Sequence, residues 1–236
     1  MATLSLLRAP QSMIFFVLIV VSFRGQTTEK KYKTYSTFPG EFKMEINRKN
    51  RRTLVESLNI EGFNTAIEVG VRTGWFSKYI LDHTKMKVYA VDPWEPNMEL
   101  VNAQECYEEC KGRLTPYGDR AVMIKGNSPQ EADAFESESV DFIYIDALHD
   151  YPAVKKDIET WWKKLRRGGV ISGHDFNRSK WPEVVRAVEE FCEERGIKFY
   201  LTGAVGNALA SQKGDLDEYD GDEQSWFIVK GKNKVG

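Results

Sequence analysis

The sequence predicts a doubly wound α/β fold, in which one mostly parallel sheet carries helices on both faces. Strand-like apolar runs alternate with helical patterns over most of the chain, which is typical of βαβ units. The last two strand-like runs have only a polar stretch between them, so the final strand is expected to be antiparallel. Seven such runs predict a seven-stranded sheet.

Composition supports one globular domain and excludes several classes of protein. The 236 residues are 42% hydrophobic and carry 33 Lys and Arg against 35 Asp and Glu, a formal net charge of -2. This is enough apolar material for a core, and no apolar run reaches the roughly 18 residues of a membrane span. Nucleic-acid-binding domains usually carry a clearly basic surface. We therefore expect a small-molecule acceptor as partner and no nucleic acid.

Residues 1–26 are predicted to be a signal peptide or an uncleaved signal anchor. The apolar run Met13–Phe23 has 11 residues and follows a single basic residue, Arg8. It is too short to cross a hydrocarbon core of roughly 30 Å but fits the apolar part of a secretory signal, with cleavage expected after Ser22. The chain is therefore expected in the secretory pathway, secreted or lumenal, or anchored in a membrane by residues 13–23. A buried hydrophobic helix is the alternative.

The folded domain is expected over residues 41–236, after a linker at residues 27–40. Charged residues interleave with apolar ones over Glu41–Leu58, which predicts an amphipathic helix ahead of the sheet. The strand-like runs then follow in chain order. They are Thr65–Val69, Met86–Val91, Ala121–Lys125, Val140–Ile145, Val170–Ser172, Ile197–Leu201 and Trp226–Val229.

Two helices between the strands have clear sequence signals. Tyr151–Leu165 begins after Asp150, a capping residue, and Gly168-Gly169 is expected to stop it. Trp181–Arg195 has apolar residues along one face. A further helical insert is expected over residues 97–118.

The end of the first strand provides a candidate binding loop, because ligands of doubly wound sheets bind outside the carboxyl ends of the strands. It is Glu68-Val-Gly-Val-Arg-Thr-Gly-Trp-Phe-Ser77. Gly70 and Gly74 allow a sharp turn and a close approach of the backbone to a ligand. Arg72 stands where a dinucleotide-binding loop needs glycine, which argues against a nicotinamide oxidoreductase. The carboxylate of Glu68 favours a ligand with an amine or sulfonium group.

The next two strand ends indicate a nucleoside. Asp92 lies 22 residues after Gly70, the spacing at which a carboxylate accepts hydrogen bonds from ribose hydroxyls. Trp94 can offer its ring to a purine, and is equally compatible with an ordinary core or surface aromatic. Asn127 and Ser128 are small and polar, where a base edge can be held.

The fourth and fifth strand ends carry the residues expected to be catalytic. Two of the three histidines, His149 and His174, lie there beside carboxylates. Asp146, His174 and Asp175 are candidate ligands of a divalent metal, and His149, together with Asp146, is a candidate for proton removal. The competing interpretation is that Asp175 caps a helix and His149 is an ordinary surface residue.

Together these motifs resemble the class I S-adenosylmethionine-dependent methyltransferases, and most of all the methyltransferase-24 family, which is similar in layout to catechol O-methyltransferase. The resemblance spans Asn59 to Val229. It implies a Rossmann-like fold, S-adenosyl-L-methionine as cofactor and, as in the metal-dependent members, a divalent metal such as magnesium.

The resemblance also implies roles by position. Glu68 and Gly70 are expected at the methionine portion of the cofactor, Asp92 at its ribose and Ser128 at its adenine. The full set expected to bind the cofactor is Glu68, Gly70, Arg72, Gly74, Ser77, Asp92, Trp94, Asn127, Ser128 and Asp146.

Two positions depart from the family pattern at the metal site. His149 stands where metal-dependent members place a lysine base, and His174 where they place an acidic ligand, whereas Asp146 and Asp175 match metal-ligand positions. A softer ion than magnesium and metal-free base catalysis by His149 are both compatible with this departure.

The predicted reaction is methyl transfer to an oxygen atom of a small-molecule acceptor, with His149 or a bound divalent metal assisting deprotonation. Transfer to a nitrogen or a carboxylate is one alternative. A lumenal module that binds the cofactor without turnover is another. A metal-dependent hydrolase is a further alternative. It would need the histidines at the strand ends but would have no role for Glu68 and Asp92.

Overall fold

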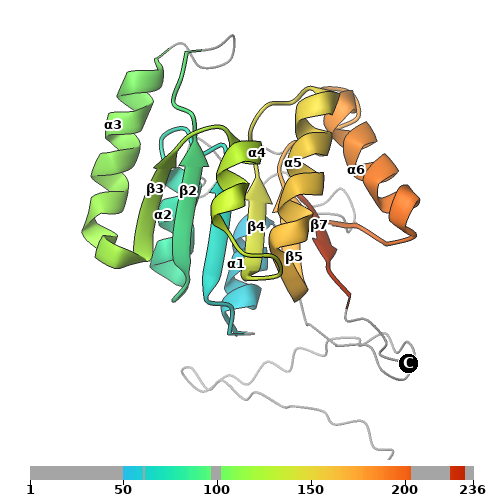
Figure 1. Cartoon of the computed structure of the whole chain (residues 1–236), viewed down its shortest axis with the longest axis horizontal. Coiled ribbons are helices and arrows are strands. Elements are labelled where there is room, and N and C mark those ends of the chain that lie inside the picture. The colour runs from blue at the N-terminus through green and yellow to red at the C-terminus, as the bar shows by residue number, and fades with distance from the viewer. Residues whose placement is uncertain (1–49, 61, 97–101, 203–223, 232–236) are drawn as a thin grey trace, which may run out of the picture. The chain divides into compact units, whose positions relative to one another are not determined.

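Seven strands form one sheet in the order β3-β2-β1-β4-β5-β7-β6 (Figure 1). Strands β1 to β5 run parallel, and β7 is antiparallel to both of its neighbours. The predicted seven-stranded, Rossmann-like sheet with an antiparallel last strand is therefore confirmed. The strands are β1 (Thr65–Val69), β2 (Lys87–Asp92), β3 (Ala121–Lys125), β4 (Val140–Ile145), β5 (Leu165–Gly173), β6 (Tyr200–Leu201) and β7 (Trp226–Val229).

The computed structural model describes residues 50–60, 62–96, 102–202 and 224–231. The predicted leader and linker lie outside these residues, as does the first part of the helix expected over residues 41–58. Among the described residues, no helix combines the length and the apolar character needed to cross a membrane.

Helices cover both faces of the sheet, as the fold class requires. One apolar cluster joins the sheet to α1 (Arg51–Ile60), α2 (Trp75–His83) and α3 (Ala103–Leu114). A second cluster joins the opposite face to α5 (Tyr151–Lys164) and α6 (Pro182–Arg195). Figure 1 shows α4 (Ser128–Glu131) and α5 in front of the sheet, with α1 and α2 behind it. Two short 3-10 helices, η1 (Thr115–Arg120) and η2 (Ala132–Ala134), complete the connections.

The central strand β4 explains why the apolar runs are continuous rather than alternating. All six of its residues are buried, since helices pack on both sides. Ile143 and Ile145 belong to the cluster with α5 and α6, whereas Phe142 and Tyr144 belong to the cluster with α1 and α2.

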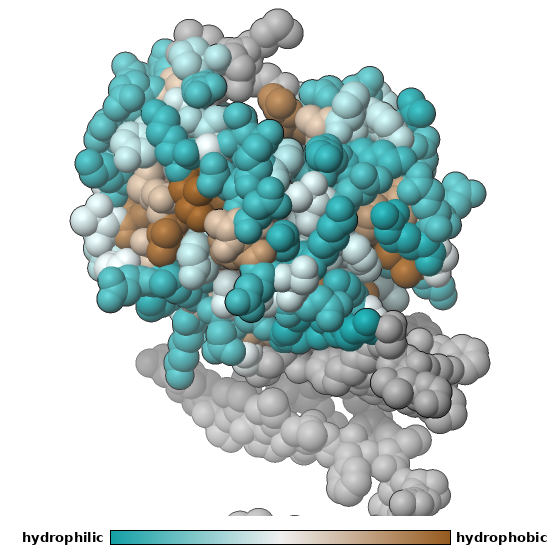
Figure 2. Space-filling model, viewed as in Figure 1, coloured by the Kyte–Doolittle hydropathy of each residue, from teal (hydrophilic) through white to brown (hydrophobic). Residues whose placement is uncertain are grey.

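The face seen in Figure 2 is mostly hydrophilic, with apolar side chains gathered between α3 and α4. Tyr89 of β2, Ile124 of β3 and Phe135 are partly buried members of the core on this side. Because α4 is only four residues long, it covers β2 and β3 less completely than α5 covers β4 and β5.

Helix α5 begins as predicted but ends for a different reason. The Asp150 carboxylate accepts a hydrogen bond from the Ala153 N–H at 3.0 Å, which caps the first turn. The helix stops at Lys164 because Leu165 is already extended and pairs with Val140 in the sheet. The prediction that Gly168-Gly169 stops the helix is thus wrong, since both glycines lie inside β5.

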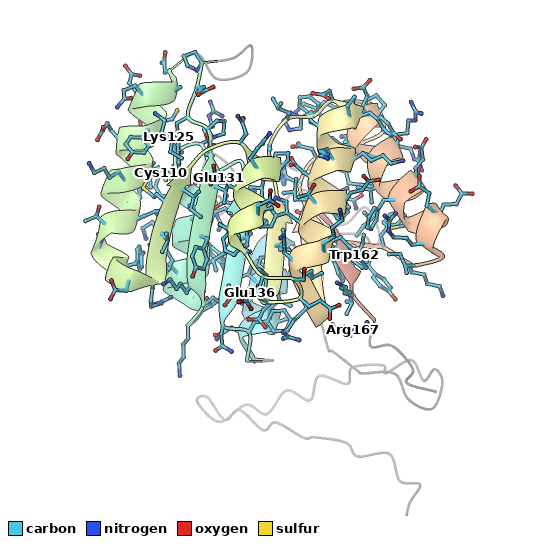
Figure 3. All side chains as sticks on the ribbon, viewed as in Figure 1. Cys110, Lys125, Glu131, Glu136, Trp162 and Arg167 are labelled. Carbon is cyan, nitrogen blue, oxygen red and sulfur yellow. The ribbon has the colours of Figure 1, made fainter. Side chains whose placement is uncertain are left out.

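The three cysteines are free and buried. Cys106 and Cys110 lie on the face of α3 that packs onto the core, and Cys110 is labelled in Figure 3. Burial raises the pKa of the Cys110 thiol to about 12. These thiols therefore act as small apolar core groups.

Candidate functional site

A cleft of about 330 Å³ lies at the carboxyl ends of β1, β2, β4 and β5. This is the edge at which doubly wound sheets bind ligands, and the volume is within the range of small-molecule sites. Of the residues that the sequence singled out, those lining the cleft are Glu68, Gly70, Arg72, Asp92, Asp146, His149 and His174.

Glu68 projects from β1 and is only 2% exposed. Its carboxyl group accepts a hydrogen bond from the Ser77 hydroxyl. Burial raises the pKa of Glu68 to about 8, because a carboxylate loses its hydration in the protein interior. In the ligand-free protein Glu68 is therefore mostly protonated at neutral pH, and a bound cation would favour its ionised form.

Gly70 makes the turn out of β1 possible. Its φ is +83°, a conformation that side chains rarely adopt. A Cβ at this position would lie 2.1 Å from the backbone oxygen of Asp146. The loop after β1 and the end of β4 are thus in direct contact, and only glycine fits between them.

Asp92 holds the loop after β1 in place. Its Oδ2 accepts hydrogen bonds from the Val71 and Arg72 N–H groups, both at 2.8 Å, and its Oδ1 accepts one from the Trp94 N–H at 2.7 Å. A carboxylate offers about four acceptor positions. Asp92 therefore keeps limited capacity for the ribose contact that its position predicts, and its main role in the ligand-free protein is structural.

Five of the ten residues predicted to bind the cofactor are not among those that line the cleft, namely Gly74, Ser77, Trp94, Asn127 and Ser128. Trp94 is 3% exposed, and its indole N–H donates to the Arg72 carbonyl at 2.8 Å. This placement favours the alternative of an ordinary core aromatic over stacking on a purine. Ser77 is fully buried and contacts Glu68 instead of a ligand. Gly74 is required because a Cβ there would lie 2.8 Å from the sulfur of Cys110.

Ser128, which is expected at the adenine, is partly buried, and its hydroxyl already has two partners within the protein. Its hydroxyl donates to Asp157 at 2.6 Å and accepts from the Trp161 indole N–H at 2.7 Å. Asn127 is exposed and precedes α4. Neither residue lines the cleft described above.

The Asp157 carboxyl group in this buried network gives a stability prediction. Burial raises its pKa to about 6, above the ordinary value near 3.9. Because the folded state binds the proton more tightly than the unfolded state, stability is lost as pH rises between these two values. We expect Asp157→Asn to raise the free energy of unfolding by up to roughly 3 kcal/mol at pH 8 but little at pH 4, in urea titrations at both pH values. Equal effects at both pH values would contradict this.

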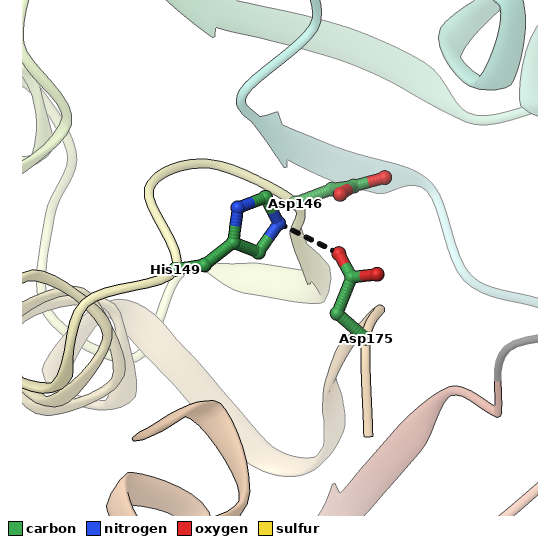
Figure 4. A group of neighbouring side chains, drawn as sticks. All are labelled: Asp146, His149 and Asp175. Carbon is green, nitrogen blue, oxygen red and sulfur yellow. Dashed lines mark hydrogen bonds and ion pairs between the residues drawn. The ribbon is translucent and has the colours of Figure 1, made fainter. Parts of the chain in front are cut away.

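Asp175 contacts both site histidines, and Figure 4 shows its contact with His149. Its Oδ2 lies 2.7 Å from His149 Nε2, and its Oδ1 lies 3.2 Å from His174 Nδ1. Asp175 has a φ of +59°, a strained conformation for a non-glycine residue that is common at functional sites. The His149 ring also stacks on Trp181, with centroids 4.1 Å apart. The imidazole of His149 is thereby fixed in orientation at the cleft.

Asp146 completes this group from the end of β4. Burial raises its pKa, although the neighbouring His174 lowers it. Burial lowers the pKa of His174 itself, but the hydrogen bond to Asp175 and the charge of Asp146 outweigh this, and the net shift is upward. The pKa values of Asp146 and His174 are therefore both shifted upward.

A divalent metal has one suitable set of ligands among the described residues. Ligand atoms of Asp146, His149 and Asp175 all lie within 4.8 Å of one another, and two carboxylates with one imidazole are acceptable donors for a divalent cation. The predicted set was Asp146, His174 and Asp175. The candidate group in the structure contains His149 in place of His174, and His174 Nδ1 lies 3.2 Å from Asp175 Oδ1.

Eight residues that line the cleft were not among the predicted site residues, and they include Arg51, Trp75 and Leu148. Arg51 reaches the cleft from the first turn of α1, and nothing in its sequence neighbourhood indicates this. Trp75 and Leu148 line the cleft and are 42% and 45% exposed. Trp75 directly follows Gly74, and Leu148 lies two residues after Asp146. Large apolar side chains that are exposed at a cleft are typical of a ligand-binding surface.

Comparisons with known proteins agree with this geometry. Residues 67–176 match the family model Methyltransf_24, described as a methyltransferase domain. Uncharacterized protein R132 of Acanthamoeba polyphaga mimivirus is 24% identical over 179 residues, which cover 70% of this chain and 78% of that protein.

Two solved structures illustrate the range of proteins with this fold. The O-methyltransferase TomG from Streptomyces achromogenes, in complex with SAM, has a TM-score of 0.55 and 17% identity, covering 77% of this chain and 80% of TomG. An rRNA methylase from Streptococcus thermophilus has a TM-score of 0.52 and 14% identity, covering 75% of this chain and 94% of the methylase. The shared fold therefore leaves the acceptor to be argued from the site.

Proposed function

We propose that this chain is an S-adenosylmethionine-dependent methyltransferase and that it methylates an oxygen atom of a small-molecule acceptor. The match of residues 67–176 to a methyltransferase-domain model supports this proposal, as does the fold shared with an O-methyltransferase. The observation that carries the proposal is the His149 imidazole, held by Asp175 at the cleft that also contains Glu68 and Gly70. A hydroxyl acceptor must lose its proton during methylation, and this imidazole is placed to receive it.

The cleft residues fit the cofactor. Bound S-adenosylmethionine supplies a methyl group on a positively charged sulfur. Glu68 offers a buried carboxyl group to the ammonium group, and Gly70 lets the backbone approach. Asp92 fixes the loop that follows Gly70. These residues position the ligand, which is the main source of acceleration in a transfer between two bound molecules.

His149 would act as the base through its second ring nitrogen. If Nε2–H donates to Asp175, the Nδ1 atom carries the lone pair that accepts the acceptor proton. When a divalent metal is bound instead, Asp146, His149 and Asp175 would hold it, and it would acidify the acceptor hydroxyl. In that case His149 is a ligand and is not available as a base.

The test has two parts. The protein is first titrated with S-adenosylhomocysteine. It is then incubated with S-adenosylmethionine and phenols, carboxylic acids or amines, in the presence and absence of EDTA, and the products are analysed. We expect binding and methylated phenols. Absence of binding would contradict the proposal. Methylation confined to acids or amines would favour the alternative acceptors, and binding without any product would favour a non-catalytic module. Residence in the secretory pathway stays a prediction that rests on residues 1–26.

Replacing His149 by glutamine distinguishes the two routes to deprotonation. If deprotonation is metal-free, we expect kcat of His149→Gln to be roughly 100- to 10,000-fold below that of the wild type. Its pH–rate profile should lack the acidic limb. The activity of the wild type should not change when EDTA is added. Affinity for S-adenosylhomocysteine should stay within about twofold. His174→Gln is the control, because His174 contacts Asp175 from its other oxygen. A pH–rate profile unchanged in His149→Gln would remove His149 from proton transfer.

A further inference from the structure

Arg51 is a cleft residue that lies outside the part of the chain matched by the methyltransferase family model. It begins α1, whereas the match covers residues 67–176. The helix start is well defined, because Asn50 Oδ1 accepts from the Thr53 N–H at 2.9 Å and Thr53 Oγ1 accepts from the Asn50 N–H at 3.1 Å. This reciprocal cap fixes the first turn.

Packing holds α1 firmly against the rest of the domain. Leu54, Val55 and Leu58 have no exposed surface. They belong to the same apolar cluster as Phe76 of α2. The first turn of α1 therefore has a fixed position relative to the cleft.

The guanidinium group of Arg51 is placed inside the cleft with little freedom. Its side chain is only 12% exposed, and its Cζ lies 4.9 Å from the centre of the Phe76 ring. Its Nη1 is 3.6 Å from Asp146 Oδ2, which is a charge contact rather than a direct hydrogen bond. A planar guanidinium held in this way is suited to binding a carboxylate.

One buried acid, Glu68, and one nearly buried guanidinium, that of Arg51, thus both line the cleft. An α-amino acid carries an ammonium and a carboxylate on one carbon, so it needs partners of both signs placed close together. Glu68 can serve the ammonium, and the charge of Arg51 acts on Glu68 directly, since it lowers the pKa of that residue. The second arginine that lines the cleft, Arg72, is exposed.

We infer that Arg51 binds the carboxylate of the methionyl group of S-adenosylmethionine, while Glu68 binds its ammonium group. The inference rests on the proposed function, because it assigns a further residue to the same cofactor. It makes α1 part of the cofactor site. It also implies that ligands without the carboxylate bind less tightly than S-adenosylhomocysteine.

The experiment is a cycle of two ligands and three proteins. S-adenosylhomocysteine and its analogue lacking the carboxylate are titrated into the wild type, Arg51→Met and Arg52→Met. Arg52 is the matched control, because it is the next residue of α1 and its guanidinium lies over Tyr79, 5.1 Å from the ring centre, rather than in the cleft. Arg51→Lys is added because it keeps the charge without the planar fork.

In the wild type, removing the carboxylate from the ligand should weaken binding roughly 10- to 100-fold, the range for a lost charge-assisted hydrogen bond. Arg51→Met should weaken binding of S-adenosylhomocysteine by a similar factor but change binding of the analogue less than about twofold. Arg51→Lys should recover part of the loss, and Arg52→Met should behave like the wild type.

Equal weakening of both ligands in Arg51→Met would assign a purely structural role to Arg51 and overturn the inference. Unchanged binding of both ligands would overturn it too, even if KM for the acceptor rose. Failure of the wild type to bind either ligand would overturn the proposed function together with the inference. The two failures are therefore distinguishable.

Discussion

Glu68→Gln is expected to make the ligand-free protein more stable and at the same time to weaken its binding of the cofactor. The pKa of Glu68 is raised by burial to about 8, compared with roughly 4.3 in an unfolded chain. The folded state therefore holds a proton that the unfolded state has released. Stability decreases as pH rises through this interval, by up to roughly 5 kcal/mol above pH 8. A glutamine carries no such cost and can still accept the hydrogen bond of Ser77.

The stability gain is measured by urea unfolding at pH 5, 7 and 9, where it should grow with pH. Glu136→Gln is the control, because Glu136 is exposed and undergoes the same change of charge. A stability gain in Glu68→Gln that does not depend on pH would contradict a buried, protonated Glu68.

Binding of S-adenosylhomocysteine should release protons in the wild type and none from this position in Glu68→Gln. At pH 7 a carboxyl group with a pKa of about 8 is mostly protonated, so pairing with an ammonium group releases about 0.9 proton. Calorimetry in two buffers of different ionisation enthalpy measures this number. The affinity should rise toward pH 8, where free α-amino groups begin to lose their proton. Glu68→Gln should bind roughly 10- to 100-fold more weakly at that pH.

Gly70→Ala is expected to be the most damaging single-methyl change in the cleft. The new Cβ would lie 2.1 Å from the backbone oxygen of Asp146 and 2.6 Å from the Cα of Ala147. Both contacts are with backbone, so neither can be relieved by a side-chain rotation, and the φ of +83° adds strain. We expect a loss of at least roughly 4 kcal/mol in the free energy of unfolding and no measurable cofactor binding.

Gly62→Ala separates the steric part of this effect from the backbone part. Gly62 has a similar φ of +76° but nothing within 4 Å of the position of a Cβ. It should lose only about 1 kcal/mol and bind the cofactor normally. Similar losses in the two variants would show that the contact between the loop after β1 and the end of β4 is loose.

Continuous apolar runs made the strands predictable from the sequence. The bounds of β1, β3, β4 and β7 agree with the predicted runs. For β1, β4 and β7 this is because most of their residues are buried, and a strand buried on both faces reads as an apolar run. Strand β5 starts five residues earlier than predicted, since Arg166 and Arg167 within it are polar. Hydropathy alone does not assign such residues to a strand.

Side-chain orientation at the cleft was less predictable. Trp94 and Trp75 are equally apolar in sequence, but a φ of +43° accompanies the inward placement of Trp94, whereas Trp75 stays exposed at the cleft. The Ser128 hydroxyl donates a hydrogen bond to Asp157, which lies 29 residues further along the chain. The contribution of Arg51 depends on how α1 packs onto α2. These outcomes depend on tertiary contacts that no local pattern encodes.

In the strand order, the β1–β4 pair is the boundary between two halves of the sheet. One half contains β1, β2 and β3, and the other contains β4, β5, β7 and β6. Glu68 and Asp92 belong to the first half, whereas Asp146 and His149 belong to the second. A ligand that contacts both groups is released when this boundary opens. At 100 times its dissociation constant, such a ligand adds about 3 kcal/mol to the cost of opening. Amide hydrogen exchange in β1 and β4 should therefore slow together when the cofactor is bound, which would make the cofactor a determinant of cooperativity in this domain.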